Sequence, residues 1–354
     1  MKAYLVLETG EIYSGIWHGG KARAGEVVFN TSHSGYEEIA TDPSYFSQIV
    51  VLTAPMQGNY SVDNAVWESR QIWIEGFICV QVQNSVRDQD WIKRLSENGI
   101  PLVSELDTRN LVLRLRSGGT PWGALVQASS EKEASVLAQK LILEKKKLPK
   151  DWVYLTSRAE SEIRKGKNAV GPRVAVLDFG SKENILREVA EWSSEMKIFN
   201  SRTSAKDILS YKPQAIMLTN GPGDPADVEV AQTTVRELLG QIPIFGICMG
   251  HQVLALALGA KTYKMKFGHR GSNHPIKDDL IRKIYVTSQN HGYAVQKETL
   301  PSDVTVTHTN LNDQTVAGIY SASRKCLGIQ YHPEACPGPH EAQELFKYFF
   351  ERVL

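Results

Sequence analysis

The sequence predicts a mixed α+β domain over residues 1–150 and an α/β domain with a mainly parallel sheet over residues 172–354. Three observations support this prediction. The chain has 354 residues, enough for roughly two domains of average size. Strand patterns separated by turns dominate the first half, whereas strand, loop and helix patterns alternate in the second. Residues 151–171 are polar and flanked by lysines, which predicts a linker with a solvated surface.

The first half is expected to hold short strands followed by two helices. Apolar or alternating runs predict strands at 3–7, 12–16, 27–29, 49–52 and 72–82. The helical patterns span 90–97 and 107–116. Asp107 is a typical N-cap of the second helix, and the glycines at 118 and 119 end it.

The second half repeats one unit, in which a short apolar run leads through a sharp loop into a helix. The runs are 173–177, 215–218 and 242–247. In parallel sheets, ligands bind at the carboxyl ends of the strands. The loops after the second and third runs are therefore the first places to look for chemistry.

Composition limits the class of protein. Lys plus Arg number 40 and Asp plus Glu 39, a net charge of +1, which argues against a nucleic-acid-binding protein. No apolar run approaches the ~18 residues of a membrane helix, and residues 3–7 are too short for a secretory signal. The four cysteines at 79, 248, 326 and 336 form no C-x-x-C pair, so we expect reduced thiols and a cytoplasmic location.

The strongest chemical motif is Gly246-Ile247-Cys248-Met249-Gly250, which is the thiol counterpart of a nucleophile elbow. Two glycines allow a sharp turn from strand to helix, and the positive end of the helix dipole favours a thiolate at Cys248. A buried structural cysteine is the alternative for any single thiol. The flanking glycines favour the nucleophile here.

A cysteine nucleophile needs a base, and the base needs an orienting group. His332 and Glu334 follow the apolar segment 327–331 and lie two positions apart, so both point to one side of an extended chain. Glu334 is thus expected to orient His332 toward Cys248. A surface turn is the alternative for these residues taken alone.

Other loops provide polar backbone and amide groups. Gly221-Pro222-Gly223 is expected to supply an N–H that stabilises an oxyanion together with the Met249 N–H, although a simple turn explains it equally well. The stretch 289–293 suits a small polar ligand. There is no phosphate-binding P-loop, and His269 and His274 lack the neighbours of a metal site.

These residues together resemble the class I (triad) glutamine amidotransferases, and within them the small, glutamine-hydrolysing subunits of carbamoyl-phosphate synthetases. GICMGHQ at 246–252, NGPGDP at 220–225 and HPE at 332–334 carry the wider resemblance. More specific motifs are KFGH at 266–269, NHP at 273–275, QNHG at 289–292, HPEACPGPH at 332–340, GEVVFNTS at 25–32, GY at 35–36, TDPSY at 41–45 and DTR at 107–109.

The resemblance implies a role for each site residue. Cys248 would attack the side-chain amide of glutamine and form a thioester, His332 would transfer the proton, and Glu334 would orient His332. The positions that contact glutamine in the family hold Ser44, Gly221, Gly223, Met249, Gln252, Asn290, Gly292 and Tyr293. Met249 and Tyr293 stand where Leu and Phe are more usual, and Cys336 where Ser is common.

The resemblance also implies the fold of the first domain and a partner. It suggests a swivelling β/β/α domain over residues 1–150. A large subunit would bind ATP, Mg²⁺ and bicarbonate and receive ammonia through a tunnel, so no cofactor or metal is expected in this chain. The product, carbamoyl phosphate, would feed pyrimidine and arginine biosynthesis. Whether the expected heterodimers assemble further is left open.

Three alternatives compete with this hypothesis. An amidotransferase serving anthranilate or guanylate synthesis would not need residues 1–150 in this form. A peptidase-like cysteine hydrolase would not need the Gly221 loop and His332-Pro333-Glu334. A silent scaffold protein would not need an intact triad.

Overall fold

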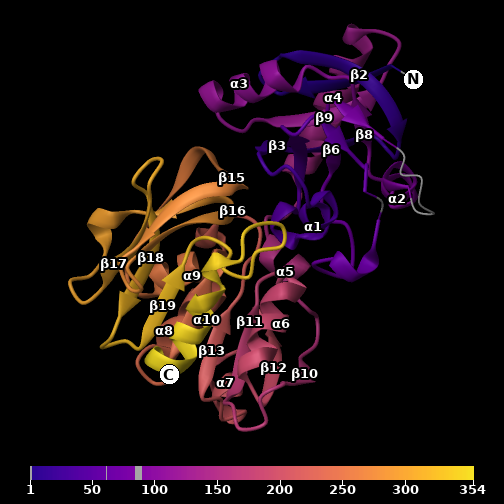
Figure 1. Cartoon of the computed structure of the whole chain (residues 1–354). Coiled ribbons are helices and arrows are strands. Elements are labelled where there is room, and N and C mark those ends of the chain that lie inside the picture. The colour runs from indigo at the N-terminus through magenta and orange to yellow at the C-terminus, as the bar shows by residue number, and fades with distance from the viewer. Residues whose placement is uncertain (1, 61, 84–89) are drawn as a thin grey trace. The chain divides into compact units, whose positions relative to one another are not determined.

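The computed structural model describes residues 2–60, 62–83 and 90–354. Contacts between residues divide the chain into two compact units, Met1–Pro149 and Lys150–Leu354. Figure 1 shows both units, with the colour running from indigo at the N-terminus to yellow at the C-terminus. Each unit is described by itself below.

The first unit is built on a closed barrel with strand order β1-β2-β8-β6-β4-β3-β9 (Figure 1). These strands are β1 (Lys2–Leu7), β2 (Ile12–Gly19), β3 (Arg23–Asn30), β4 (Gln48–Leu52), β6 (Gly76–Ile78), β8 (Leu102–Ser104) and β9 (Trp122–Gln127). The short strands β5 (Met56–Gln57) and β7 (Gln81–Val82) pair separately. The run at 72–82, expected as one strand, therefore contributes to two different sheets.

Helices complete the first unit and confirm its mixed α+β character. They are α1 (Tyr36–Thr41), α2 (Trp91–Glu97), α3 (Thr108–Gly118) and α4 (Glu131–Lys146). Asp90 and Asp107 cap α2 and α3, each accepting a hydrogen bond from a backbone N–H in the first turn. Helix α4 packs its buried Ala134, Ala138 and Ile142 against strands β1 and β9.

The second unit contains a sheet of order β10-β12-β11-β13-β14-β19-β18-β17-β15-β16. The strands β12 (Glu195–Asn200), β11 (Arg173–Asp178), β13 (Ala215–Leu218), β14 (Ile244–Ile247) and β19 (Cys326–Ile329) are parallel and form its core. The antiparallel strands are β10 (Glu162–Lys165), β15 (Thr262–Asp278), β16 (Lys283–Val295), β17 (Thr305–Asn310) and β18 (Val316–Ser321). The prediction of an α/β domain is thus confirmed. The parallel strands form only half of the sheet, whereas a mainly parallel sheet was expected, because the antiparallel strands from β15 to β18 extend it on one side.

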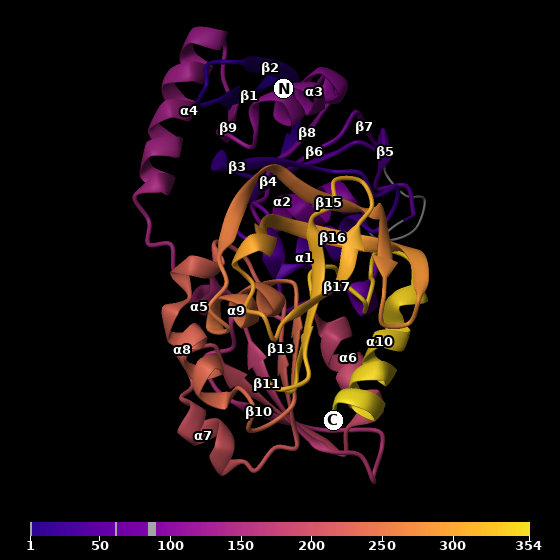
Figure 2. The ribbon, with the colours of Figure 1, turned by 90° about the vertical axis from the view of Figure 1, so that its left-hand side faces the viewer.

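Helices cover both faces of the parallel strands (Figure 2). One face is covered by α7 (Ala205–Ser210), α8 (Glu229–Leu238) and α9 (Met249–Ala257), and α5 (Trp152–Thr156) packs on the same core through Val153. The other face is covered by α6 (Glu183–Trp192), α10 (Glu344–Tyr348) and a final π-helical turn, Phe349–Val353. Each face buries its own apolar core, as expected of a doubly covered parallel sheet.

The segment 151–171, expected to be a linker, belongs to the second unit. It contains α5 and β10, and β10 pairs antiparallel with the edge strand β12. Its charged side chains form ion pairs: Arg158 with Asp178 and Glu183, Arg164 with Glu162 and Glu183, and Lys167 with Glu191. From the sequence alone, the charged residues of this segment indicated exposure to solvent. Most of their acidic partners lie outside the segment, so the ion pairs become visible only in the folded structure.

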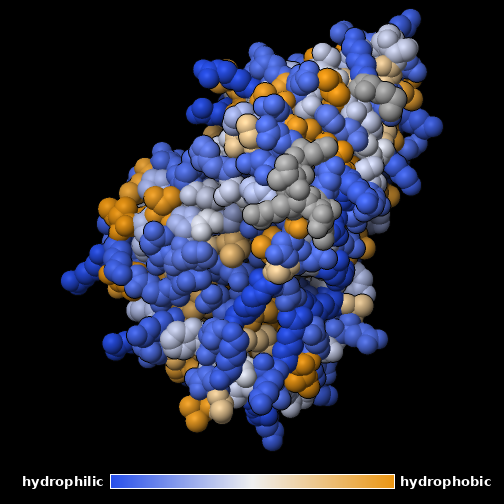
Figure 3. All heavy atoms as spheres, turned by 45° about the vertical axis from the view of Figure 1, so that its right-hand side comes forward, coloured by the Kyte–Doolittle hydropathy of each residue, from blue (hydrophilic) through white to orange (hydrophobic). Residues whose placement is uncertain are grey.

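The surface seen in Figure 3 is mostly hydrophilic, with hydrophobic residues in small groups. Among the described residues, no helix combines the length and the apolar character needed to cross a membrane.

Removal of one aromatic ring should test the core beneath α10. Phe346 is fully buried, and its ring meets the edge of Phe245 at 5.6 Å between centroids. Phe346→Ala is expected to lower the free energy of unfolding by about 3–5 kcal/mol because it leaves a cavity. Urea denaturation measures this loss. Val170→Ala, at a position 94% exposed, should change it by less than about 0.5 kcal/mol. Equal effects of the two variants would contradict the described packing.

Candidate active site

Three loops from neighbouring parallel strands meet at one edge of the second unit's sheet. Strand β14 ends directly before Cys248, β13 leads into the Asn220–Asp224 loop, and β19 leads to His332 and Glu334. Because β13, β14 and β19 are adjacent and parallel, their carboxyl ends lie at the same edge. The fold therefore brings together residues up to 114 positions apart in the sequence: Asn220 and Glu334.

Cys248 occupies a strained turn between β14 and α9. Its backbone has φ 54° and ψ −103°, a left-handed conformation that costs free energy in a residue other than glycine. A Cβ on Gly246 would lie 2.6 Å from the Gly250 carbonyl oxygen, and a Cβ on Gly250 would lie 2.2 Å from the Leu218 carbonyl oxygen. Both glycines are therefore required for the helix to begin this close to the sheet.

The Cys248 side chain is buried among groups from two other segments. Its Sγ lies 3.5 Å from the Asn290 carbonyl oxygen, and Gln330 Nε2 lies 3.9 Å from Sγ. Met249 is the first residue of α9, so its N–H is one of the four that have no partner within the helix. The thiol thus lies at the positive end of the α9 dipole.

His332 and Glu334 form a buried pair beside this thiol. His332 Nδ1 lies 2.6 Å from Glu334 Oε1, and the two side chains are 2% and 0% exposed. The other ring nitrogen, Nε2, has no hydrogen-bond partner of normal geometry among the described residues. The Cys248 thiol is close enough to act on the pKa of the ring. The structure thus pairs His332 with Glu334, and the triad that would include Cys248 stays a prediction.

The charges in this pair reinforce each other. Burial alone would lower the pKa of His332, but the Glu334 carboxylate and a contact with Cys248 outweigh burial and raise it above the usual value. Burial would likewise raise the pKa of Glu334, but Lys182 and His332 hold it below its usual range.

Lys182 is a site residue that the sequence analysis missed. Its Nζ donates to Glu334 Oε1 at 3.1 Å and to the Ala335 carbonyl, and its side chain is 3% exposed. It follows the carboxyl end of β11, the strand beside β13, as the N-cap position of α6. The sequence did offer one indication of its role: Lys182 lies in the loop after the first apolar run, and that loop is expected at the same sheet edge as the other two.

The loop after β13 is shaped by close backbone packing. A Cβ on Gly221 would lie 2.2 Å from the Phe179 carbonyl oxygen, and Gly223 has φ +91°. The loop is tied to α9, since the Gly250 N–H donates to the Thr219 carbonyl oxygen at 2.9 Å. Its backbone is thus fixed close to the start of α9, as an oxyanion site requires.

The residues expected to contact glutamine fall into two groups. Gly221, Gly223, Met249, Gln252, Asn290, Gly292 and Tyr293 all lie in the second unit, on the β13 loop, α9 and β16. Gln252 links two of these elements, because its Nε2 donates to the Tyr293 carbonyl at 2.8 Å and to Gln330 Oε1 at 3.0 Å.

Ser44 belongs to the first unit, in a short 3₁₀ helix, Pro43–Tyr45, where its N–H donates to Asp42 Oδ1 at 2.8 Å. Its contact with glutamine stays a prediction.

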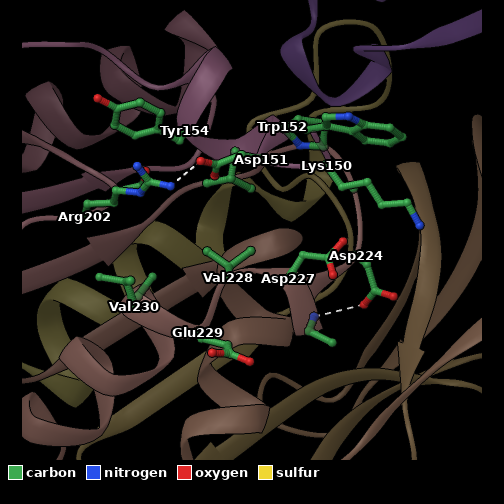
Figure 4. Close-up of a pocket in the computed structure, with 16 residues that line it drawn as sticks. Lys150, Asp151, Trp152, Tyr154, Arg202, Asp224, Asp227, Val228, Glu229 and Val230 are labelled. Carbon is green, nitrogen blue, oxygen red and sulfur yellow. Dashed lines mark hydrogen bonds and ion pairs between the residues drawn. The ribbon is translucent and has the colours of Figure 1, made fainter. Parts of the chain in front are cut away.

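A pocket of about 400 Å³ lies beside the β13 loop (Figure 4). It is lined by residues 150–154, 201–202, 222–224 and 226–231, and by none of Cys248, His332 and Glu334. Trp152 lies against Gly223, where an added Cβ would be 3.3 Å from the indole. The pocket therefore adjoins the loop but is not formed by the triad.

Among the described residues, no group of three or more His, Cys, Asp or Glu side chains is arranged to hold a metal ion.

Comparison with known proteins gives two family matches. Residues 175–352 match the family described as glutamine amidotransferase class-I, and residues 5–125 match the carbamoyl-phosphate synthase small chain, CPSase domain. Each match falls largely within one of the two units.

Relatives of similar length match nearly the whole chain, and each is named carbamoyl phosphate synthase small chain. The one from Symbiobacterium thermophilum is 44% identical over 98% of this chain and 97% of its own length. The one from Chlorobaculum tepidum is 43% identical over 99% and 97%. The one from Methanocaldococcus jannaschii is 42% identical over 98% and 97%.

Because α9 lies so close to the sheet, replacing a glycine of this helix with alanine is expected to destabilise the protein instead of stabilising it. Gly→Ala within a helix normally stabilises by about 0.5–1 kcal/mol. Gly250→Ala should instead lower the free energy of unfolding by about 1–3 kcal/mol, because the new methyl group meets the Leu218 carbonyl. Gly118→Ala in α3 is the control, since its neighbour is the flexible end of Arg114. Stabilisation by both variants in urea denaturation would show that α9 lies farther from the sheet.

The buried pair predicts a pH-dependent contribution to stability. The lowered pKa of Glu334 adds stability above its ordinary value of 4.5, and the raised pKa of His332 adds stability below its ordinary value of 6.5. Glu334→Gln should therefore cost most between these values, about 3 kcal/mol. The cost should shrink as the pH falls through the pKa of Glu334 or rises through that of His332. Urea denaturation at several pH values measures this.

The control for this pH dependence is Glu191→Gln, which removes an exposed pair with Lys167. Its effect should be small at every pH because exposed ion pairs contribute little. A cost of Glu334→Gln that stays constant from the acidic to the alkaline range would contradict the ion pair.

Proposed function

Because the chain belongs to the family of carbamoyl-phosphate synthase small chains, we propose that it hydrolyses glutamine with Cys248, His332 and Glu334 as its catalytic triad. The family resemblance drawn from the sequence motifs is confirmed by the two family matches and by the full-length relatives. The observation that supports the triad is the buried contact of His332 Nδ1 with Glu334 Oε1 at 2.6 Å, with the Cys248 thiol near enough to raise the pKa of the ring.

The geometry supports the following reaction. Cys248 Sγ attacks the side-chain amide carbon of glutamine, and His332 transfers a proton to the departing nitrogen as the C–N bond breaks. Ammonia leaves, and a thioester joins the glutamyl group to Sγ. Water, deprotonated by His332, then attacks the thioester, the S–C bond breaks, and glutamate and the thiol are released. Glu334 holds the Nδ1 side of the ring throughout.

The loop and the first turn of α9 support stabilisation of the tetrahedral intermediates. The Met249 N–H and an N–H of the Gly221–Gly223 segment would donate to the oxyanion. Gln252, Asn290, Gly292 and Tyr293 would bind the rest of the glutamine molecule. The packing of Gly221 on Phe179 keeps this backbone fixed before the substrate binds.

The partner would be the large subunit of a carbamoyl-phosphate synthase. The sequence contains no P-loop, so the ATP and Mg²⁺ needed to activate bicarbonate would bind to that subunit. Ammonia would travel to it through a shielded path, because ammonia in water at neutral pH is mostly protonated and unreactive. The complex would act in the cytoplasm and supply carbamoyl phosphate for pyrimidine and arginine biosynthesis.

The match of residues 5–125 to the small-chain domain favours this client over anthranilate or guanylate synthesis. The match of residues 175–352 to the class-I glutamine amidotransferases favours an amidotransferase over a peptidase, and the buried His332–Glu334 pair argues against a silent scaffold protein.

Cys248→Ala tests the proposal directly. Glutamate release from glutamine should fall by at least about 10⁴-fold, because a covalent mechanism cannot proceed without its nucleophile. Carbamoyl phosphate synthesis by the complex with ammonia in place of glutamine should remain near the wild-type rate. Both reactions are measured with the chain and the large subunit together, with ATP and bicarbonate present.

The matched control is Cys326→Ala, which removes a buried thiol on β19 that makes no part of the triad. It should keep glutamine-dependent synthesis. Loss of ammonia-dependent synthesis in Cys248→Ala would count against a glutaminase subunit, and an unchanged rate of glutamate release would rule out Cys248 as the nucleophile.

A further inference from the structure

Within the segment 151–171, Arg158 makes a group of hydrogen bonds at the active-site edge of the sheet. Its backbone N–H and its Nη1 both donate to Asp178 Oδ2 at 2.9 Å. The same Nη1 lies 2.9 Å from Ser181 Oγ, and Nη2 lies 2.8 Å from Glu183 Oε1. Arg158 thus contacts three residues in a stretch of six, 178–183, that runs from the end of β11 into α6.

Asp178 links Arg158 to the backbone of residues 178–183. Its Oδ1 accepts hydrogen bonds from the Gly180 N–H at 2.9 Å and the Ser181 N–H at 2.7 Å. One carboxylate therefore fixes the turn with one oxygen while Arg158 holds the other oxygen. The Asp178 side chain is only 1% exposed, so its charge depends on Arg158 for compensation.

Lys182 is the next residue of this turn, and it reaches the triad. Its backbone N–H donates to Asn220 Oδ1 at 3.0 Å, and its Nζ lies 3.1 Å from Glu334 Oε1. The side chain is buried and spans from the turn to the loop after β19. A shift of the turn would therefore move Nζ relative to the carboxylate that orients His332.

We propose that Arg158 is a positioning residue for the triad, acting through Asp178 and the 180–182 turn to hold Lys182 against Glu334. The inference rests on the proposed glutaminase function and adds a residue outside the family matches at 5–125 and 175–352. Within the described part of the chain, the hydrogen bonds of the Arg158 side chain go to Asp178, Ser181, Glu183 and Glu162, and none goes to Cys248, His332 or Glu334. Its effect is to hold Lys182 in place, so that Lys182 holds Glu334, the carboxylate that orients His332.

The charged groups around Glu334 determine how a substitution of Arg158 should change the pKa of Glu334. The titratable and charged side chains that act on Glu334 or on its partner are Lys182, His332, Cys248 and Glu188 of α6. Lys182 is the cation among them that does not take part in proton transfer. If Lys182 moves away, the Glu334 carboxylate loses an attractive charge while it stays buried. Glu334 then takes up a proton at a higher pH than in the wild type.

Arg158→Gln tests the proposal, with Arg164→Gln as the matched control. Arg164 pairs with Glu162 and Glu183, as Arg158 does, but it contacts neither Asp178 nor Ser181. Glutamate release is measured as a function of glutamine concentration and pH, for the chain alone and with the large subunit. Urea denaturation of each variant reports its stability.

We expect Arg158→Gln to lower kcat about tenfold or more with little change in KM, because a small displacement of a catalytic group has a large effect on rate. The acidic limb of its pH–rate profile should move to higher pH. Arg164→Gln should keep the wild-type rate and profile. Arg158→Lys, which keeps the charge but not the forked geometry, should recover part of the rate and shift the limb less.

Three results would overturn the proposal. The first is an Arg158→Gln variant with wild-type kcat and profile. The second is a loss of kcat in both Arg158→Gln and Arg164→Gln that is proportional to the loss of unfolding free energy of each variant, with no shift of the acidic limb of the pH–rate profile. If Arg158→Gln does not fold, a wild-type profile in Arg158→Lys is the third. Absence of glutamate release by the wild-type chain, alone and in the complex, would refute the proposed function instead.

Discussion

The turn at Cys248 brings α9 against the sheet more closely than any side chain at Gly246 or Gly250 would allow. A Cβ at either position would lie within 2.6 Å of a backbone oxygen. Between these glycines Cys248 has φ 54° and ψ −103°, and its thiol lies at the start of α9. The β13 loop then follows, because the Gly250 N–H is bonded to the Thr219 carbonyl. One steric constraint thus sets the nucleophile and the loop beside it.

The base is held by charge instead of by close packing. Lys182, Glu334 and His332 are at most 3% exposed, and removing charged groups from water costs several kcal/mol for each ion. Mutual pairing compensates this cost only if the geometry is good. The carboxylate accepts from Lys182 at 3.1 Å and lies 2.6 Å from His332 Nδ1. Any arrangement that separates the three groups leaves a buried charge unpaired, so the ring has one favoured orientation.

Local signals predicted the elements around the nucleophile, and long-range ion pairs hid the rest. Glycine spacing and an apolar run are sufficient to predict β14, Cys248 and α9, and a two-residue spacing is sufficient to pair His332 with Glu334. Lys182 lies 152 positions from Glu334, so no local pattern relates them. Similarly, the charges of 151–171 suggested solvent exposure because Asp178 and Glu183, which pair with Arg158, lie outside the segment.

The first residues of the second unit pack against two parts of its active-site edge. Lys150 is its first residue, so the chain that leaves Pro149 enters α5 almost at once. Trp152 lies against Gly223, and Thr156 Oγ1 donates to the Phe179 carbonyl on which Gly221 packs. Arg158 then holds Asp178. Residues 152–158 therefore contact both the loop expected to stabilise the oxyanion and the turn that leads to Lys182.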